Sequence, residues 1–242
     1  MGRTLVIGDI HGGLKALHQI FDKANVTSED NLIFLGDYVD GWSDSAATVS
    51  YLIELEQKQN CIFIRGNHDD LCFQWLALER DNPDWRKHGG LATMEGYQNF
   101  TNKEKRKHIK FYRSTRNYHV DDENRLFLHA GFTNLHGPHR EYFPRLCHWD
   151  RTLWETALAV DPKLSADDIR YPQRLKLFKE IFIGHTPVTR INQTTPVQAQ
   201  TVWNVDTGAA FKGPLTILDI DSKEYWQSDP VWQLYPDEQG RN

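Results

Sequence analysis

Cysteine is scarce in this sequence: only Cys61, Cys72 and Cys147 occur among 242 residues. Their odd number and wide, unequal spacing match neither a CxxC metal knuckle nor an obvious disulfide framework. The chain also has no run of 18 or more apolar residues, and no basic segment followed by a long apolar stretch near its start. We therefore expect no signal peptide, no membrane partner and a cytoplasmic location.

An excess of positive charge is also missing. Lys and Arg together number 28 against 33 Asp and Glu, which gives a formal net charge of −5. Without a global basic field, we expect no nucleic-acid partner. The lysine-rich stretch 103–110 could face an anionic partner, but a solvated helix face is the favoured interpretation. A hydrophobic content of 39% with 12% aromatic residues is typical of a packed globular enzyme.

No internal repeat, low-complexity tract or flexible linker divides the sequence, so residues 1–242 are expected to form a single domain. Short apolar runs alternate with segments of helical spacing, which predicts a parallel sheet with crossover helices. Strands are expected over 5–7, 32–35, 62–64, 126–128, 181–183, 202–205 and 215–220, and helices over 13–24 and 43–57. Residues 80–118 and 132–178 are expected to form helical and loop insertions above the carboxyl ends of the strands.

Polar residues of metal-ligand type follow five of these strand candidates directly. They stand in the segments Gly8-Asp9-Ile10-His11-Gly12, Gly36-Asp37-Tyr38-Val39-Asp40, Gly66-Asn67-His68-Asp69, His129-Ala130-Gly131 and Gly184-His185-Thr186-Pro187. The carboxyl ends of parallel strands face one crevice, and glycine lets a metal or phosphate approach the backbone closely. The pattern therefore predicts one cluster of Asp, His and Asn donors without sulfur.

Taken singly, each segment could be an ordinary structural feature. A Gly-Asp pair after a strand is often a turn or a helix N-cap, and a lone histidine at a strand end is often a satisfied core residue. Five such endings, in order, on five strand candidates favour a shared functional site over independent turns.

The ordered set resembles the calcineurin-like metallophosphoesterase superfamily. Within it, the chain is similar to the phosphoprotein phosphatase branch, especially its small bacterial and phage-type serine/threonine phosphatase-like members. The resemblance runs from Gly8 to about Leu218 and includes Asn204-Val205-Asp206-Thr207-Gly208-Ala209. It implies an α/β fold of two packed mixed β-sheets flanked by helices, an αββα sandwich, with helical insertions over the site.

The resemblance also implies the ligands of two divalent metal ions. Asp9, His11 and Asp37 would hold the first ion, with Asp37 bridging both, and Asn67, His129 and His185 would complete the second. A bridging carboxylate suits two cations about 3.5–4 Å apart. Oxygen and imidazole donors suit manganese, which is the expected metal, and leave iron or zinc as alternatives.

Two further residues of the motifs are predicted to be catalytic. His68 would protonate the leaving oxygen as a general acid, and Asp40 would fix the orientation of its ring. The alternative for Asp40 is a helix cap. The resemblance implies attack by a hydroxide on the metals without a phosphoenzyme. The sequence also lacks a P-loop, a Cys-x5-Arg motif and a Gly-x-Ser-x-Gly elbow.

The chain departs from the family pattern at two positions. Pro187 stands where phosphodiesterase-like relatives carry a second histidine, which favours the phosphatase branch. Gly41 stands where the phosphatase branch carries an arginine that clamps the substrate phosphate. Arg151, in the segment Trp149-Asp150-Arg151, is the first candidate to replace that arginine, with a surface role as the alternative. Trp42 either packs against a nucleobase of a substrate or, more ordinarily, anchors its loop.

The leading prediction is a dinuclear-metal phosphatase that hydrolyses phosphate monoesters and is serine/threonine protein phosphatase-like. The alternative enzyme is a hydrolase of dinucleoside polyphosphates such as diadenosine tetraphosphate. Either way the partner is a phosphorylated substrate, a phosphoprotein or a nucleotide. A hypothesis from another class is an inactive phosphate-binding adaptor, which the missing arginine at Gly41 motivates.

Overall fold

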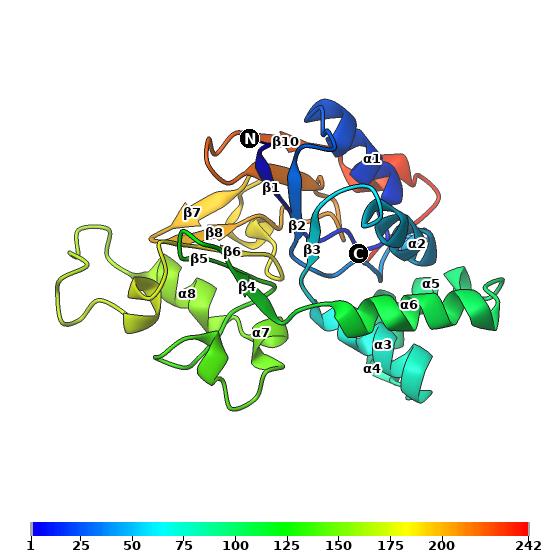
Figure 1. Cartoon of the computed structure of the whole chain (residues 1–242), viewed down its shortest axis with the longest axis horizontal. Helices are drawn as coiled ribbons and strands as arrows, with labels where there is room; N and C mark the ends of the chain where they lie inside the picture. Colours follow the sequence, from blue (N-terminus) through cyan, green and yellow to red (C-terminus); the bar gives the residue numbers. More distant parts are fainter. Residues whose placement is uncertain (1, 242) are drawn as a thin grey trace.

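Two five-stranded β-sheets lie face to face at the centre of the structure, a computed structural model that describes residues 2–241 (Figure 1). The first sheet has the strand order β10-β9-β1-β2-β3. Its strands are β1 (Thr4–Ile7), β2 (Asn31–Phe34), β3 (Cys61–Phe63), β9 (Thr216–Asp219) and β10 (Tyr225–Gln227). Strands β1, β2 and β3 are parallel, and β9 pairs antiparallel with β1.

The second sheet has the order β4-β5-β6-β8-β7. Its strands are β4 (Tyr118–Val120), β5 (Arg125–Leu128), β6 (Glu180–Ile183), β7 (Val197–Ala199) and β8 (Val202–Asn204). Strands β5, β6 and β8 are parallel, while the edge strands β4 and β7 run antiparallel to their neighbours. Both sheets are therefore mixed, as the family resemblance implied.

Alternate residues of the central strands face opposite sides of each sheet, which separates the core into layers. Val6, Ile33, Phe127 and Phe182 belong to the hydrophobic cluster between the two sheets. The rings of Phe127 and Phe182 stack there with their centroids 5.1 Å apart. Because both faces of these strands are buried, they appear in the sequence as short continuous apolar runs.

Helices cover the outer faces of the sandwich. Helices α1 (Leu14–Lys23) and α2 (Ser45–Leu55) pack on the first sheet, and α8 (Thr152–Ala159) packs on the second. The αββα architecture is therefore confirmed. The expected position of residues 132–178 is wrong in part, because α8 buries Leu153 and Trp154 against the outer face of its sheet and does not lie over the strand ends.

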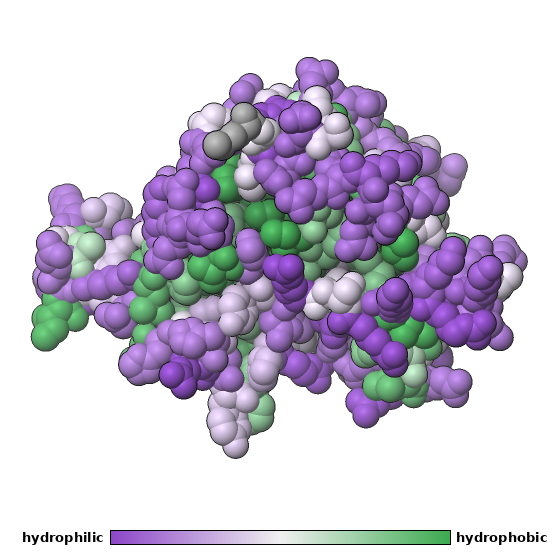
Figure 2. All heavy atoms as spheres, viewed as in Figure 1, coloured by the Kyte–Doolittle hydropathy of each residue, from purple (hydrophilic) through white to green (hydrophobic). Residues whose placement is uncertain are grey.

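A helical insertion joins the two sheets between β3 and β4. Its elements are α3 (Asn67–Leu78), α4 (Pro83–Trp85), the π-helical turn η1 (Arg86–Gly90), α5 (Leu91–Gly96) and α6 (Asn102–Ser114). Helix α6 buries His108, Phe111 and Tyr112 and leaves most of the basic stretch exposed. Figure 2 shows this part of the surface as hydrophilic, which agrees with a solvated helix face.

The remaining elements are short. They are η2 (Pro138–Arg140), α7 (Leu146–Trp149), η3 (Gln173–Lys176), η4 (Val188–Ile191) and α9 (Val231–Leu234). The three cysteines are free thiols. Within residues 2–241, none of the helices combines the length and apolar character that crossing a membrane requires. The cytoplasmic location stays a prediction.

The ring of Phe127 tests the packing between the sheets. Phe127→Ala should lower the free energy of unfolding by about 3–5 kcal/mol, because it leaves a cavity in a fully buried layer. Urea denaturation followed by circular dichroism measures this change. Phe143→Ala is the matched control, because its ring is 64% exposed and its removal should cost less than about 0.5 kcal/mol. Equal effects of the two variants would contradict the assignment of this layer.

Candidate active site

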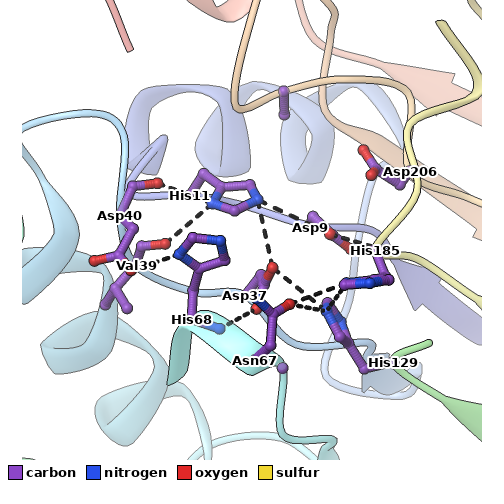
Figure 3. A network of polar contacts seen from close by, with 12 residues as sticks. Asp9, His11, Asp37, Val39, Asp40, Asn67, His68, His129, His185 and Asp206 are labelled. Carbon is purple, nitrogen blue, oxygen red and sulfur yellow. Dashed lines mark hydrogen bonds and ion pairs between the residues drawn. The ribbon is translucent and has the colours of Figure 1, made fainter. Parts of the chain in front are cut away.

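Loops from both sheets bring the predicted site residues together at one end of the sandwich (Figure 3). Those that follow the first sheet are Asp9 and His11 after β1, Asp37 and Asp40 after β2, and Asn67 and His68 at the start of α3. His129 follows β5 and His185 follows β6, in the second sheet. All eight side chains are buried. The structure brings all eight together, from loops of both sheets of the sandwich that the family resemblance implied.

Asp37 lies between two groups of metal-ligand type. In the first, His11 Nε2 lies 3.6 Å from Asp37 Oδ2 and 3.9 Å from Asp9 Oδ2. In the second, His129 Nε2 lies 3.4 Å from the same Asp37 oxygen, and His185 also belongs to this group. The two groups share Asp37 alone, which is the position that a bridging ligand needs.

Asn67 closes the second group. Its Oδ1 lies 3.1 Å from His129 Nε2 and 3.0 Å from His185 Nδ1. These three atoms form a triangle of one oxygen and two nitrogens, since His185 Nδ1 is 3.2 Å from His129 Nε2. Its donors come from α3 and from the loops after β5 and β6, so the triangle exists only once the insertion and the second sheet are in place.

Backbone carbonyls fix the tautomers of two histidines. His11 Nδ1 lies 2.8 Å from the carbonyl oxygen of Asp40, and His129 Nδ1 lies 2.9 Å from that of Leu35. A carbonyl can only accept, so each Nδ1–H donates and Nε2 is the nitrogen that faces the cluster. Metal-binding histidines are commonly oriented by a hydrogen bond of this kind.

Several site residues hold a strained backbone. His11, Asp37, Asp40 and His185 have φ angles of 51°, 51°, 73° and 67°, in the left-handed region that costs a residue other than glycine about 1–3 kcal/mol. Such strain persists where surrounding contacts over-determine it, and it gathers at functional sites. Here it turns each side chain inward directly after a strand.

Two glycines make room for the carboxylates. A Cβ added at Gly184 would lie 2.0 Å from Asp9 Oδ1, and one added at Gly66 would lie 2.0 Å from Asp37 Oδ1. Glycine is therefore required at both positions by close approach, as the sequence motifs suggested.

The electrostatics of the cluster favour cations. Burial raises the pKa of Asp9 well above its ordinary value, and the charges of Asp206 and Asp37 raise it further. Burial lowers the pKa of His129, but the charges of Asp37 and Asp9 outweigh this effect and raise it to about 10. Asp9 Oδ1 is buried and has no hydrogen-bond partner among residues 2–241. Buried carboxylates with unused oxygens beside imidazole nitrogens fit divalent metal ions.

His68 and Asp40 form a buried pair. His68 Nδ1 lies 2.6 Å from Asp40 Oδ2, and the hydroxyl of Thr93 donates to Asp40 Oδ1 at 2.6 Å. Trp85 Nε1 also donates to this carboxylate. The alternative of a helix cap for Asp40 is wrong, since the cap residue of α2 is Asp44 and the carboxylate of Asp40 binds these three side chains instead.

Four residues support the site in ways that no sequence pattern predicted. Asp69 accepts hydrogen bonds from the backbone N–H groups of Asp37, Tyr38 and Gly66, at 2.8, 2.9 and 2.8 Å, and so holds two ligand loops together. Asp69 and Asp206 lie within the sequence motifs around Asn67 and Asn204, and this position was the only sequence feature that could have marked them as site residues. Trp85 and Thr93 lie in the helical insertion, where no pattern marked them.

A pocket of about 620 Å³ opens over the cluster. It is lined by His11, Asp37, Asn67, His68, His185 and Asp206, by the aromatic rings of Trp85, Trp149 and Phe211, and by the arginines Arg145, Arg151, Arg190 and Arg241. Arg151 therefore lies at the pocket, as expected from the sequence; its substrate-binding role stays a prediction. Trp42 is fully buried and donates from Nε1 to the carbonyl oxygen of Ala209 at 2.7 Å, which fits the role of a loop anchor.

A buried oxygen and nitrogen cluster below an arginine-lined pocket, at one end of an αββα sandwich, defines a metal-dependent phosphoesterase. A family model described as calcineurin-like phosphoesterase matches residues 2–209, and the chain belongs to this family. The resemblance seen in the sequence is thereby confirmed.

Named relatives match the chain over very different lengths. It is 29% identical to "Bis(5'-nucleosyl)-tetraphosphatase PrpE [asymmetrical]" of Bacillus thuringiensis (strain Al Hakam), with 90% of this chain and 91% of the relative covered. It is 37% identical to "Serine/threonine-protein phosphatase PP1-delta" of Caenorhabditis elegans over 67 residues, which cover 27% of this chain and 22% of the relative.

Solved structures share the fold. One titled "Crystal structure of a putative diadenosine tetraphosphatase" matches with a TM-score of 0.64 at 16% identity, covering 93% of this chain and 92% of that one. A Saccharomyces cerevisiae serine/threonine phosphatase with similarity to human PP5 matches with a TM-score of 0.55 at 16% identity, covering 94% and 80%. At this identity the likeness concerns the fold alone.

Replacement of Gly184 tests the close approach to Asp9. Gly184→Ala should weaken metal binding by about 10- to 100-fold, because the added methyl group displaces the Asp9 carboxylate. Titration of manganese into metal-free protein by calorimetry measures the affinity. Gly96→Ala is the control, because its added Cβ meets nothing nearer than 3.2 Å and lies in α5. Unchanged manganese affinity in Gly184→Ala would refute the steric argument.

Proposed function

We propose that this protein hydrolyses a phosphoanhydride bond of a dinucleoside polyphosphate, using two divalent metal ions. The observation that carries the proposal is the lining of the pocket, where four arginines and three aromatic rings surround the ligand cluster. The relatives that cover 90% of this chain carry the name of a bis(5'-nucleosyl)-tetraphosphatase, which supports the same choice. This reverses the order of the two enzyme predictions made from the sequence.

The arginines concentrate positive charge beyond what one phosphate needs. Arg145 is paired with Asp70 at 2.9 Å, whereas Arg151, Arg190 and Arg241 form no ion pair with a carboxylate of residues 2–241. Burial lowers the pKa of Arg151, and the charges of Arg190 and Arg241 lower it further. A bound polyanion would reduce the repulsion between these unpaired guanidinium groups. The planar N–H donors of each guanidinium also match the geometry of phosphate oxygens.

The aromatic side chains offer surfaces for a base. Trp149 is 39% exposed and borders the same pocket as the half-buried Phe211, whereas the third ring, Trp85, is buried and donates to Asp40. An exposed aromatic face beside a basic pocket suits stacking by a nucleobase, which contributes about 1–3 kcal/mol per base in nucleic-acid complexes. A phosphoserine side chain has no ring to use these surfaces.

The residues proposed to hold the ions are Asp9, His11 and Asp37 on one side and Asp37, Asn67, His129 and His185 on the other. When bound, two such ions stabilise the charge on phosphoryl oxygens and lower the pKa of water. Manganese stays the expected metal, with iron or zinc as alternatives.

His68 is proposed to donate a proton from Nε2 to the leaving oxygen. Its Nδ1 is held by Asp40, which is itself fixed by Thr93 and Trp85, so the ring is held in place beside the pocket that it lines. Its Nε2 has no hydrogen-bond partner among residues 2–241. The backbone N–H of His68 donates to Asp37 Oδ1 at 2.9 Å, which ties the acid to the ligand cluster.

The second candidate is the phosphomonoesterase, acting on phosphoserine or phosphothreonine proteins. Pro187 favours it, because this residue lines the pocket where phosphodiesterase-like relatives carry a histidine. An inactive adaptor fits less well, since the family is one of hydrolases and all eight predicted ligand and acid residues converge.

A substrate panel decides between the two enzymes. Manganese-loaded protein should hydrolyse diadenosine tetraphosphate with a kcat/KM at least about tenfold above that for a phosphopeptide, a difference of about 1.4 kcal/mol in transition-state stabilisation. Chromatography of the nucleotide products and a phosphate-release assay measure the two reactions. Release of phosphate from the peptide with an intact dinucleotide would overturn the proposal and leave the phosphomonoesterase.

Replacement of His68 tests the acid role. His68→Asn should lower kcat by about 10²- to 10⁴-fold on substrates whose leaving group needs a proton. The loss should be smaller on p-nitrophenyl phosphate, whose leaving group departs as a stable anion. His18→Asn, an exposed histidine in α1, is the control and should keep full activity. Equal loss on both substrates would exclude proton donation by His68.

A further inference from the structure

The backbone at Gly41 leaves a space that another part of the chain fills. Gly41 has a φ angle of 128°, and a Cβ added there would lie 3.4 Å from Arg241 Cγ. A Cβ added at Gly89, in the helical insertion, would lie 3.2 Å from the same atom. The aliphatic part of the Arg241 side chain therefore lies against two glycines from different segments.

Contacts on three sides hold the segment that carries Arg241. Its backbone N–H donates to the carbonyl oxygen of Ala210 at 2.9 Å, and its guanidinium carbon lies 5.4 Å from the centre of the Phe211 ring. Ser43 donates to Glu238 from its backbone N–H and its hydroxyl, at 2.8 and 2.7 Å.

The guanidinium of Arg241 has donors to spare. Its Nε is buried and finds no hydrogen-bond partner among residues 2–241, which costs stability unless water or a ligand supplies the acceptor. The side chain lines the pocket above the ligand cluster. A fixed guanidinium with unused donors in a pocket of this kind matches the oxygens of a phosphoryl group.

The charge of Arg241 acts on the cluster itself. A Cβ added at Gly41 would lie 3.5 Å from His11 Cβ as well as 3.4 Å from Arg241 Cγ, so Arg241 and His11 border the same space. Burial raises the pKa of Asp206 to about 6, although the charge of Arg241 works in the opposite direction. Arg241 is therefore near enough to influence residues of the ligand cluster and its border.

We infer that Arg241 binds the phosphoryl oxygens of the substrate. Its side chain lies in the space beside Gly41 that glycine, having no side chain, leaves open. Arg241 thus serves as the phosphate clamp that residue 41 does not provide, while Arg151 and Arg190 remain for other parts of the substrate. This inference rests on the proposed function only in that the substrate carries a phosphate ester or anhydride. It holds equally for a monoester and for a dinucleotide.

Three variants test the inference: Arg241→Gln, Arg241→Ala and, as a matched loss of charge on the exposed face of α6, Arg106→Gln. Arg241→Gln should lower kcat/KM for p-nitrophenyl phosphate about 10- to 100-fold and weaken inhibition by inorganic phosphate by a similar factor. Arg106→Gln should leave both unchanged. Added guanidinium ion, well below denaturing concentration, should restore part of the activity of Arg241→Ala, whereas sodium at the same ionic strength should not.

Manganese content and melting temperature of each variant identify indirect effects. Wild-type kcat/KM and phosphate inhibition in folded, metal-loaded Arg241→Gln would overturn the inference. Loss of bound manganese in proportion to activity would also overturn it, because Arg241 would then support the metal ligands. Should the wild-type protein hydrolyse no phosphate compound, the proposed function fails instead, and calorimetric titration of inorganic phosphate into metal-loaded protein still tests Arg241. Equal phosphate affinity in wild type and Arg241→Gln would refute it there.

Discussion

The carboxylate of Asp37 is buried between imidazoles that belong to both halves of the sandwich, with His11 Nε2 3.6 Å and His129 Nε2 3.4 Å from one of its oxygens. A charge in this position costs free energy unless cations or donors surround it. Asp69 therefore fixes the Asp37 loop through backbone N–H groups, Gly66 leaves space for the second carboxylate oxygen, and His68 donates its backbone N–H to that oxygen. The convergence of two sheets on one buried carboxylate determines how the rest of the site is arranged.

Away from Asp37, each side chain of the site is held in place by hydrogen bonds from residues farther out. Asp40 orients His68, and Thr93 with Trp85 fixes Asp40, so a residue at the metal cluster depends on the helical insertion. Arginines form the outermost layer, where unpaired positive charge faces the pocket. The left-handed φ angles at His11, Asp37, Asp40 and His185 occur within this network of contacts, which is where such strain can persist.

Much of the fold was predictable because buried parallel strands have a clear signal. The apolar runs around Val6, Ile33, Phe127 and Phe182 marked four central strands within a residue or two of their bounds. The edge strands β4, β7 and β10 were missed, since each is three residues long and none is fully buried. The antiparallel direction of β9 was missed as well, because an apolar run carries no information about the direction in which it pairs.

The order of amino acids is enough to establish the family, the alternation of strands and helices, and the identity of the side chains that gather at the site. These features can be recognised along the chain because each ligand-type residue stands close after a strand and near a glycine. Repetition of this local arrangement after several strands indicates one shared site. The assignment of each strand to one of the two sheets, the hydrogen bonds of Thr93 and Trp85 to Asp40, and the position of Arg241 beside Gly41 emerge only from the folded molecule. They are contacts between segments far apart along the chain, and their energies depend on distances in space that no local pattern records.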